Sequence, residues 1–286
     1  MNDQLRQTAQ IARQSLIEEV TLAPKPGLVD PVSVGAHTDM DHQLFLTSIE
    51  ALSPYLEQYI NLGYASQSDQ QLFAELRTVG QQAEQAMLTA THQVNTHKGA
   101  NFSYAFILGA LGRAYQQWSL TQLITAEFAP VFEIIQGMTT GLVSRDFQNL
   151  ATKTKLSYGE QLYVDYGLTG IRGEAEAGYP SLRLLVLPLL RGSSTKLNET
   201  QRLQLMLKLM ANVQDMNLIH RGGIEAWQQV KATATNLLTQ DYPTDLSFKQ
   251  ALQLFDQQLI NKNLSPGGTA DLLALGFFFD LLNQSH

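Results

Sequence analysis

The stretch VNTHKGANFSYAFILGAL, residues 94–111, decides the fold class of this chain. Behind its polar start, Phe102 and Phe106 stand four residues apart, while Ala105, Gly109 and, just beyond the stretch, Gly112 follow at spacings of four and three. Residues at these spacings share one face of a helix. The pattern therefore predicts a helix over 100–117 with both phenylalanines in the core. Its small residues leave a smooth groove for another helix or for a flat ligand.

The same periodicity recurs along most of the chain. Apolar residues return at three- and four-residue intervals at Leu5, Ile11, Ala12, Leu16 and Val20, and again at Leu44, Phe45, Ile49, Leu52 and Leu56. Alternating patterns typical of strands are scarce. Further helices are expected at 70–90, 121–140, 181–190, 199–214, 223–238, 246–260 and 268–283. Because no repeat or low-complexity linker interrupts the pattern, the sequence predicts an all-α fold, a single compact multi-helix domain over 1–286 with its active site built from interhelical loops.

The composition excludes several classes of protein. A chain of 286 residues with 44% apolar and 16% charged residues can bury a large core. The absence of cysteine removes disulfides and thiolate metal ligands, and it suits a reducing cytoplasm. Neither a signal peptide nor an apolar run of about 20 residues is present, so we expect a soluble, cytoplasmic protein without membrane partners.

The net charge narrows the choice of ligand. A value of −7 argues against nucleic acid as a partner, because that class needs clustered Lys and Arg. An anionic small molecule would need a local cationic pocket, or a divalent metal held by carboxylates. The sequence leaves the oligomeric state open, a homodimer included.

Glycine and proline gather in four polar connections, PKPGLVD (24–30), THKGA (96–100), GLTGIRGEAEAGYP (167–180) and SPGGTAD (265–271). Loops carried on a rigid scaffold commonly bear binding groups, so function is expected here. A further stretch, DMNLIHRGG (215–223), ends in an arginine and two glycines before a new helix. None of the five matches a known phosphate-binding signature by itself.

Each connection allows a functional and a structural interpretation. In the first, two prolines hold Lys25 on a restrained segment, where it could contact a phosphate, and Asp30 and Asp39 could lie near a metal. The structural alternative is a helix end followed by a helix start, because Thr38 and Asp41 fit a capping box. For Asp41 the cap is the preferred interpretation.

The helix that follows THKGA has an N-terminus suited to anions. If it begins near Gly99, its free backbone amides point toward Thr96, His97 and Lys98. The alternative is that Asn95 or Thr96 caps the helix while His97 and Lys98 lie in water.

The third connection places Arg172, Glu174 and Glu176 in a loop with four glycines. Arg172 could grip a phosphate with two nitrogens, and Glu174 could bind a metal or move a proton. An Arg172–Glu176 surface pair is the alternative. Ser157 and Glu160 nearby fit a capping box with no catalytic role.

The last two connections also allow a functional and a structural interpretation. Arg221 stands beside free amides with Asp215 upstream, although a solvated arginine in a turn fits equally well. Gly267 and Gly268 leave amides uncovered at a helix start, and Asp271 lies near the positive end of that helix dipole. Asp280 projects from the opposite side, so we expect it at the surface.

Taken in order, PKPGLVD with GAHTDM, NTHKGA, GIRGEAEAGYP and SPGGTADLLA resemble the triphosphoribosyl-dephospho-coenzyme A synthase family. The resemblance runs from about residue 18 to 280, and five ordered motifs make it specific. It departs before NTHKGA, where His92 and Gln93 stand in place of an expected glycine pair. Asn101 and Tyr104 also replace residues expected to be apolar.

The resemblance implies an enzyme that transfers the 5-triphosphoribosyl group of ATP to the 2′-hydroxyl of 3′-dephospho-coenzyme A and releases adenine. The product would pass to a transferase that loads the acyl-carrier subunit of citrate lyase or, in relatives, malonate decarboxylase. ATP is then a substrate, and Mg²⁺ is expected beside its triphosphate. Two alternatives stay open, a metal-dependent hydrolase of ADP-ribose-type bonds and a non-catalytic helical nucleotide-binding module.

Roles for individual residues follow as hypotheses. We assign phosphate binding to Lys25, His97, Lys98, Arg172 and Arg221, with the backbone of Gly27, Gly99, Gly267 and Gly268. Asp39, Glu174 and Asp215 are candidate catalytic carboxylates, and Asp39, Glu174 and Asp271 are candidate metal ligands. Which of these carboxylates acts as the base is not readable from sequence, because the same residue types serve both roles.

Overall fold

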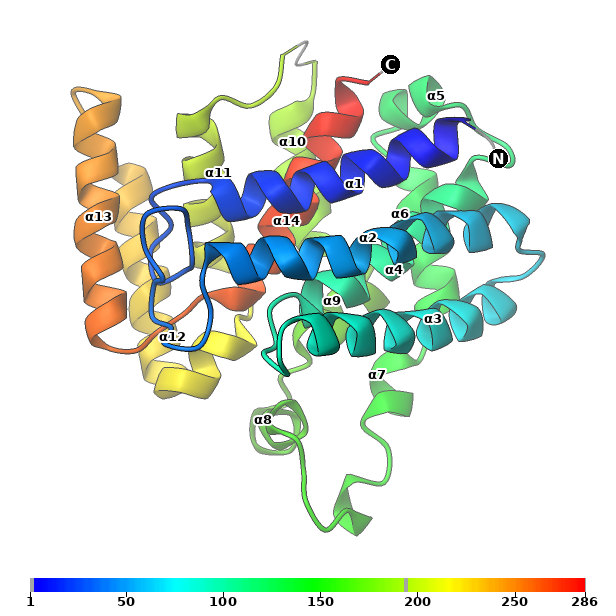
Figure 1. Ribbon diagram of the computed structural model, residues 1–286, viewed down its shortest axis with the longest axis horizontal. Coiled ribbons are helices and arrows are strands. Elements are labelled where there is room, and N and C mark those ends of the chain that lie inside the picture. Colours follow the sequence, from blue (N-terminus) through cyan, green and yellow to red (C-terminus); the bar gives the residue numbers. More distant parts are fainter. Residues whose placement is uncertain (1–2, 193–194, 286) are drawn as a thin grey trace.

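A computed structural model describes residues 3–192 and 195–285, and every regular element within them is helical (Figure 1). The elements are α1 (Asp3–Thr21), α2 (His42–Ala65), α3 (Asp69–Ala90), α4 (Lys98–Ala114), α5 (Leu120–Thr125), α6 (Ala129–Thr139), α7 (Leu142–Asp146), η1 (Leu150–Thr152), α8 (Tyr158–Tyr166), α9 (Gly170–Glu176), η2 (Leu182–Val186), α10 (Leu187–Leu190), α11 (Glu199–Asn212), α12 (Met216–Thr239), α13 (Asp245–Asn261) and α14 (Gly267–Asn283). The predicted all-α single domain is confirmed.

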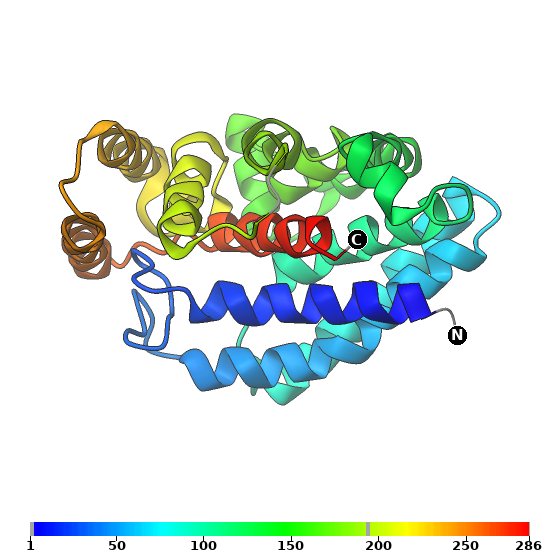
Figure 2. The ribbon, with the colours of Figure 1, turned by 90° about the horizontal axis from the view of Figure 1, so that it is seen from above.

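The core is organised around α4 and α14. Both helices are buried on nearly all sides, which fits their almost continuous apolar sequence. Figure 2 shows α14 in a middle layer, with α1 and α2 on one side of it and α10 and α11 on the other. Several apolar side chains of α14 are buried, among them Leu272, Leu275, Phe279 and Leu282. The first turns of α4 and α14 meet inside the molecule, and this meeting positions the candidate site.

The small-residue face of α4 contacts another helix rather than a ligand. A Cβ placed on Gly112 would lie 2.1 Å from the carbonyl oxygen of Ile60 in α2. A Cβ placed on Gly63 of α2 would lie 1.9 Å from the carbonyl oxygen of Gly109. The two backbones therefore approach as closely as glycine allows. Of the two occupants predicted for this groove, the helix is the one present.

Several predicted elements differ in detail. The helix expected over 121–140 is divided into α5 and α6, because Glu127 and Phe128 adopt positive φ angles of 50° and 56°. The helix expected from residue 223 forms the second part of α12, and a kink at Gly223, with φ 77°, separates it from a first part that begins at Met216. The connection 167–180 was predicted as a loop, but its centre forms α9. A single residue in the left-handed conformation ends a helix, and the periodicity of apolar residues does not reveal such a residue.

The prediction for Asp280 is wrong. Its side chain is fully buried, accepts hydrogen bonds from the Leu197 amide at 3.2 Å, and lies 3.4 Å from the guanidinium of Arg202. Because α14 has no solvent-facing side, a polar residue opposite the site is still inside the protein. Burial raises the pKa of Asp280, while the Leu197 amide and Arg202 lower it.

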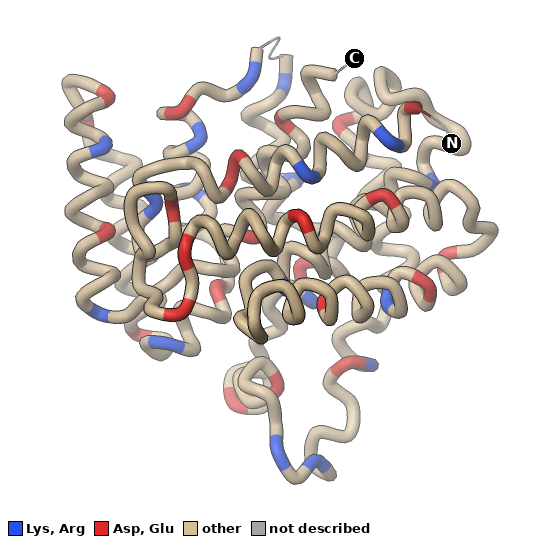
Figure 3. The backbone as a smooth tube through the Cα atoms, in the orientation of Figure 1, with Lys and Arg blue, Asp and Glu red and all other residues tan. Residues whose placement is uncertain are grey.

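Charge is distributed without a single basic face. In the view of Figure 3 the Lys and Arg positions are scattered over many helices, and acidic positions lie among them. Within the described residues, no helix is both long enough and apolar enough to cross a bilayer.

Candidate active site

The THKGA and SPGG connections meet where α4 and α14 begin. A Cβ placed on Gly99 would lie 2.0 Å from Oδ2 of Asp271, so only glycine fits against this carboxylate. Asp271 is half-buried as a residue, and its carboxylate points inward against α4. Around it lie charged and polar groups from four other segments. We call the set Glu19, Lys25, His97, Asp215 and Asp271 the buried polar centre.

Lys25 and Glu19 form a buried ion pair. The Lys25 Nζ lies 2.5 Å from Glu19 Oε1, and the two side chains are 2% and 4% exposed. Burial raises the pKa of Glu19, and the neighbouring ammonium opposes that rise. Lys25 is therefore already paired and would have to share its charge with a phosphate. Asp30 accepts hydrogen bonds from the backbone amides of Lys25, Val32 and Ser33, so it shapes the loop.

His97 is neutral and presents a buried donor. It is 3% exposed, and burial lowers its pKa to about 3, with the charge of Lys25 adding to the effect. Thr96 donates to the Ser48 hydroxyl at 2.7 Å, and Ser48 lies 2.7 Å from His97 Nδ1. Since Ser48 then donates to Nδ1, we assign the ring proton to Nε2. Among the described residues, Nε2 has no hydrogen-bond partner. A buried N–H without a partner is costly, which points to a ligand there.

The Asp271 carboxyl is strongly perturbed by its surroundings. Burial raises its pKa well above the ordinary value, the charges of Asp215 and Glu19 raise it further, and the Ala100 amide lowers it. The expectation of free amides at the start of α4 needs correction, because Ala100 faces Asp271 and the Lys98 amide donates to Asn95 Oδ1 at 3.2 Å. The chain's own side chains therefore occupy part of this helix end.

Asp215 joins α12 to α14. It caps α12 by accepting from the amides of Asn217 and Leu218, each at 3.1 Å. It also accepts from the amide and the hydroxyl of Thr269, at 2.7 and 2.9 Å. With 1% exposure and both oxygens engaged, Asp215 is placed to hold the SPGG connection, and a catalytic role for it stays a prediction.

At Gly27, Gly267 and Gly268 the backbone packs closely against other groups of the protein. A Cβ on Gly27 would lie 2.5 Å from the carbonyl oxygen of Leu264, and one on Gly267 would lie 2.2 Å from Asn217 Nδ2. A Cβ on Gly268 would be 3.3 Å from the Asp215 carboxylate. These glycines therefore serve contacts within the protein, and their predicted phosphate contacts remain untested.

Glu174 and Tyr179 bring α9 and the turn after it toward the centre. Glu174 accepts from the Ser181 hydroxyl at 2.7 Å and amide at 3.2 Å, and burial raises its pKa. Burial also raises the pKa of Tyr179, and the charges of Glu174 and Asp271 contribute. Sequence reasoning missed Tyr179. Its position in the GYP turn, where its φ is 51°, was the available signal.

Arg172 faces away from Glu176. Its Nε lies 2.7 Å from Asp146 Oδ2, and its guanidinium lies over the rings of Phe102 and Phe147. Glu176 instead accepts from the amides of Gly141 and Val143, both at 2.8 Å. The alternative of an Arg172–Glu176 pair is therefore wrong. The Ser157–Glu160 capping box at α8 is confirmed.

The remaining predicted residues lie at the edge of the site. Lys98 is 58% exposed and pairs with Glu84 at 2.6 Å. Asp39 is 61% exposed, and its Oδ1 lies 3.8 Å from His37 Nδ1. Asp41 caps α2 by accepting from the Leu44 amide, although as the cap residue itself rather than as the third residue after Thr38.

Arg221 and His37 tie three segments together. Arg221 donates to the carbonyl of Ala36 at 2.7 Å and to Asn263 Oδ1 at 2.8 Å. Its other nitrogen lies 3.1 Å from His37 Nδ1, while His37 Nε2 lies 2.8 Å from the Ser265 hydroxyl. Burial and the charge of Arg221 lower the pKa of His37, while Asp39 raises it. Because Arg221 donates to Nδ1, we assign the ring proton to Nε2. The sequence analysis missed His37, although it lies within GAHTDM.

The predicted metal ligands are not gathered. Within the described residues, no group of three or more His, Asp or Glu side chains could hold a metal ion, and the Asp39 side chain is largely exposed. The charge balance of the centre nevertheless suits a cation. Its three carboxylates, Glu19, Asp215 and Asp271, face one ammonium, and the pKa of each carboxylate is raised. Mg²⁺ commonly takes one or two protein carboxylates and completes its shell with phosphates and water.

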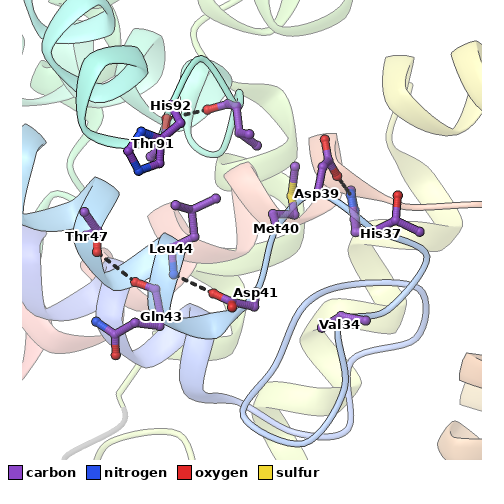
Figure 4. A pocket seen from close by; sticks show the side chains of 12 residues that line it. Val34, His37, Asp39, Met40, Asp41, Gln43, Leu44, Thr47, Thr91 and His92 are labelled. Atoms are coloured by element: carbon purple, nitrogen blue, oxygen red, sulfur yellow. Dashed lines mark hydrogen bonds and ion pairs between the residues drawn. The ribbon is translucent and has the colours of Figure 1, made fainter.

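A cleft of about 570 Å³ lies beside the buried polar centre (Figure 4). The loop before α2, the first turns of α2 and the turn between α3 and α4 enclose it. Its lining residues are Val34, His37, Thr38, Asp39, Met40, Asp41, Gln43, Leu44, Thr47, Thr91, His92 and Val94. His92 and Gln93 adopt φ angles of 53° and 69°. The backbone thus keeps the left-handed conformation that a glycine pair would favour.

Comparisons with known proteins give one consistent description. The family model for ATP:dephospho-CoA triphosphoribosyl transferase (CitG) matches residues 5–286. A relative from Streptococcus mutans serotype c (strain ATCC 700610 / UA159), described as "Probable 2-(5''-triphosphoribosyl)-3'-dephosphocoenzyme-A synthase", is 43% identical over 99% of this chain and 98% of its own. A relative with the same description from Streptococcus pyogenes serotype M5 (strain Manfredo) is 45% identical over 98% of each chain. A solved structure from Archaeoglobus fulgidus is 16% identical, with a TM-score of 0.44 over 84% of this chain and 99% of its own.

Proposed function

The chain belongs to the ATP:dephospho-CoA triphosphoribosyl transferase family, and we propose that its buried polar centre is where the reaction of that family takes place. The enzyme transfers the 5-triphosphoribosyl group of ATP to the 2′-hydroxyl of 3′-dephospho-CoA, and adenine leaves. ATP and dephospho-CoA are its small-molecule substrates. One observation supports the location above all others. Gly99 lies against Asp271, which is far from it in the sequence, and among the described residues the His97 Nε2 donor has no partner although Lys25 is near.

The chemistry calls for a carboxylate near the ribose. Breaking the bond between ribose and adenine builds positive charge at the anomeric carbon, as in glycoside cleavage, and a carboxylate stabilises that charge. The acceptor hydroxyl must also lose its proton to a base. Asp271 is the best placed group for one of these roles, because its raised pKa brings proton exchange closer to neutral pH. Glu174, bound to Ser181, is the candidate for the other.

The triphosphate needs cationic and N–H partners. We assign the buried contacts to His97 Nε2 and Lys25, and the outer contacts to Lys98, Arg172 and Arg221. Mg²⁺, which we propose as the cofactor, would supply charge neutralisation at the triphosphate, with Asp271 as a protein ligand. His97 stays neutral at physiological pH, so it would bind phosphate as a hydrogen-bond donor and not as a charge.

The wider setting is also a proposal. The product would pass to a transferase that loads the acyl-carrier subunit of citrate lyase or malonate decarboxylase, and the reaction would take place in the cytoplasm, where both substrates are made. A homodimer is compatible with these assignments.

The test is an assay for free adenine with purified protein, ATP, Mg²⁺ and dephospho-CoA. We expect adenine only when both nucleotides are present. Adenine from ATP alone would favour the hydrolase, and tight ATP binding without turnover would favour the non-catalytic module. Release of ADP or pyrophosphate would contradict the transfer, because the triphosphate is retained in the product.

A further inference from the structure

The cleft beside the buried polar centre has the character of a site for an uncharged ligand. Among the described residues that line it, none is Lys or Arg, while Asp39 and Asp41 contribute negative charge. A phosphate would be repelled there. The lining offers apolar contact from four side chains and hydrogen bonding from threonines, a glutamine and histidines, and the apolar residues are Val34, Met40, Leu44 and Val94. Such a mixture of lining groups suits a ligand in which amides alternate with apolar groups.

The position of the cleft links it to the buried polar centre. Thr47 lines the cleft, and the next residue of α2, Ser48, holds His97. Val94 also lines the cleft, and Thr96, two residues on, donates to Ser48. The cleft therefore opens next to the His97 network without sharing its side chains. A ligand reacting at the centre could extend one end into it.

The proposed reaction needs a subsite of this kind. Donor and acceptor both contain adenosine with a free 2′-hydroxyl, so neither the base nor the ribose distinguishes dephospho-CoA from ATP. The terminal phosphate marks ATP, and the pantetheine arm marks the acceptor, with its two amides, its hydroxyl and its branched apolar carbon. Positive recognition of the acceptor therefore depends on contacts to the arm. A volume of about 570 Å³ falls in the range of pockets for drug-sized ligands, whereas a purine alone would leave most of it empty.

We propose that this cleft binds the pantetheine arm of 3′-dephospho-CoA and so selects the acceptor. The assignment rests on the function proposed above. His92 gives the site a feature of its own, because its left-handed backbone places an imidazole at the rim of the cleft, where glycine would leave open space. In Figure 4 the ring lies across the cleft from Met40 and Asp39.

Steady-state kinetics with a cleft-filling variant tests the proposal. Gln43 is an exposed lining residue in the first turn of α2, so Gln43→Trp narrows the cleft without disturbing the core. Gln58→Trp, at an exposed position on the same helix outside the cleft, is the matched control. We expect Gln43→Trp to raise the KM for dephospho-CoA by about tenfold or more and to leave the KM for ATP unchanged. Gln58→Trp should change neither.

A shortened acceptor sharpens the result. AMP carries the adenosine of the acceptor without the arm, so the slow transfer to AMP should be the same in Gln43→Trp and in the unaltered enzyme. A raised KM for ATP would show that the cleft holds the donor base and would overturn the proposal, as would unchanged constants for both substrates. If the unaltered enzyme released no adenine with any acceptor, the proposed function itself would fail. That result differs from one in which transfer is intact and the Gln43→Trp substitution changes neither KM.

Discussion

At the residue scale, the left-handed pair before α4 shows how the chain keeps a backbone that its sequence disfavours. Non-glycine residues at positive φ cost about 1 kcal/mol each. Gln93→Gly should therefore stabilise the protein by about 1 kcal/mol, and Gln93 does not line the cleft. Chemical denaturation measures the change. Gln81→Gly, the same substitution at an exposed position inside α3, should destabilise by about 0.5 kcal/mol. Equal effects at the two sites would show that the conformation is not strained.

Asp271 links stability to pH. Its folded pKa is raised, so the folded state holds the proton more tightly than the unfolded chain, in which the pKa is near 3.8. The contribution of Asp271 is fully present below that value and is lost as pH rises through the folded pKa. The unfolding free energy should thus fall as pH rises above about 3.8 and through the folded pKa, and Asp271→Asn should reduce this slope. Thermal unfolding at several pH values without nucleotide measures it. A slope that the variant leaves unchanged would contradict the electrostatic assignment.

At the element scale, the crossing of α4 and α2 depends on glycine. The Cβ of Gly112→Ala would collide with a backbone oxygen of α2, which cannot move aside as a side chain could. We expect a destabilisation of about 1–3 kcal/mol, the usual cost of overpacking a core. Gly80→Ala in α3 is the control, because a Cβ there meets only the Tyr59 hydroxyl at 3.9 Å. It should stabilise by about 0.5–1 kcal/mol. Similar denaturation midpoints for both variants would count against the crossing.

The helices were predictable because their periodicity is strong, while their ends were not. The spacing of Phe102 and Phe106 identifies α4 from sequence alone, and the capping box of Ser157 and Glu160 marks the start of α8. The break between α5 and α6 depends on two residues with positive φ that carry no glycine signal. The burial of Asp280 depends on which helices surround α14, and no local pattern contains that information.

At the scale of the whole molecule, the sequence indicated which segments carry function but not how they meet. Gly99, Lys25 and Asp271 lie in connections whose glycine and proline content already indicated function. The pairing of Lys25 with Glu19 could not be predicted, because the sequence around Glu19 is that of an ordinary helix, α1, and carries no sign of an ion pair. The contacts of His37 and Tyr179 likewise join distant segments. Asp39 had the right residue type for a metal ligand and an exposed position in the folded chain.

We propose that the reaction takes place where α4 and α14 begin, with Asp271 as a reacting carboxylate. Two aspartates of α14 allow a matched comparison, because Asp280 lies away from the centre and is held by Leu197 and Arg202. The decisive measurement is kcat for adenine release from ATP and dephospho-CoA. We predict that Asp271→Asn lowers kcat by at least about 100-fold, the usual effect of losing a catalytic acid or base, while Asp280→Asn keeps it within about twofold. Equal rates in the two variants would contradict the claim.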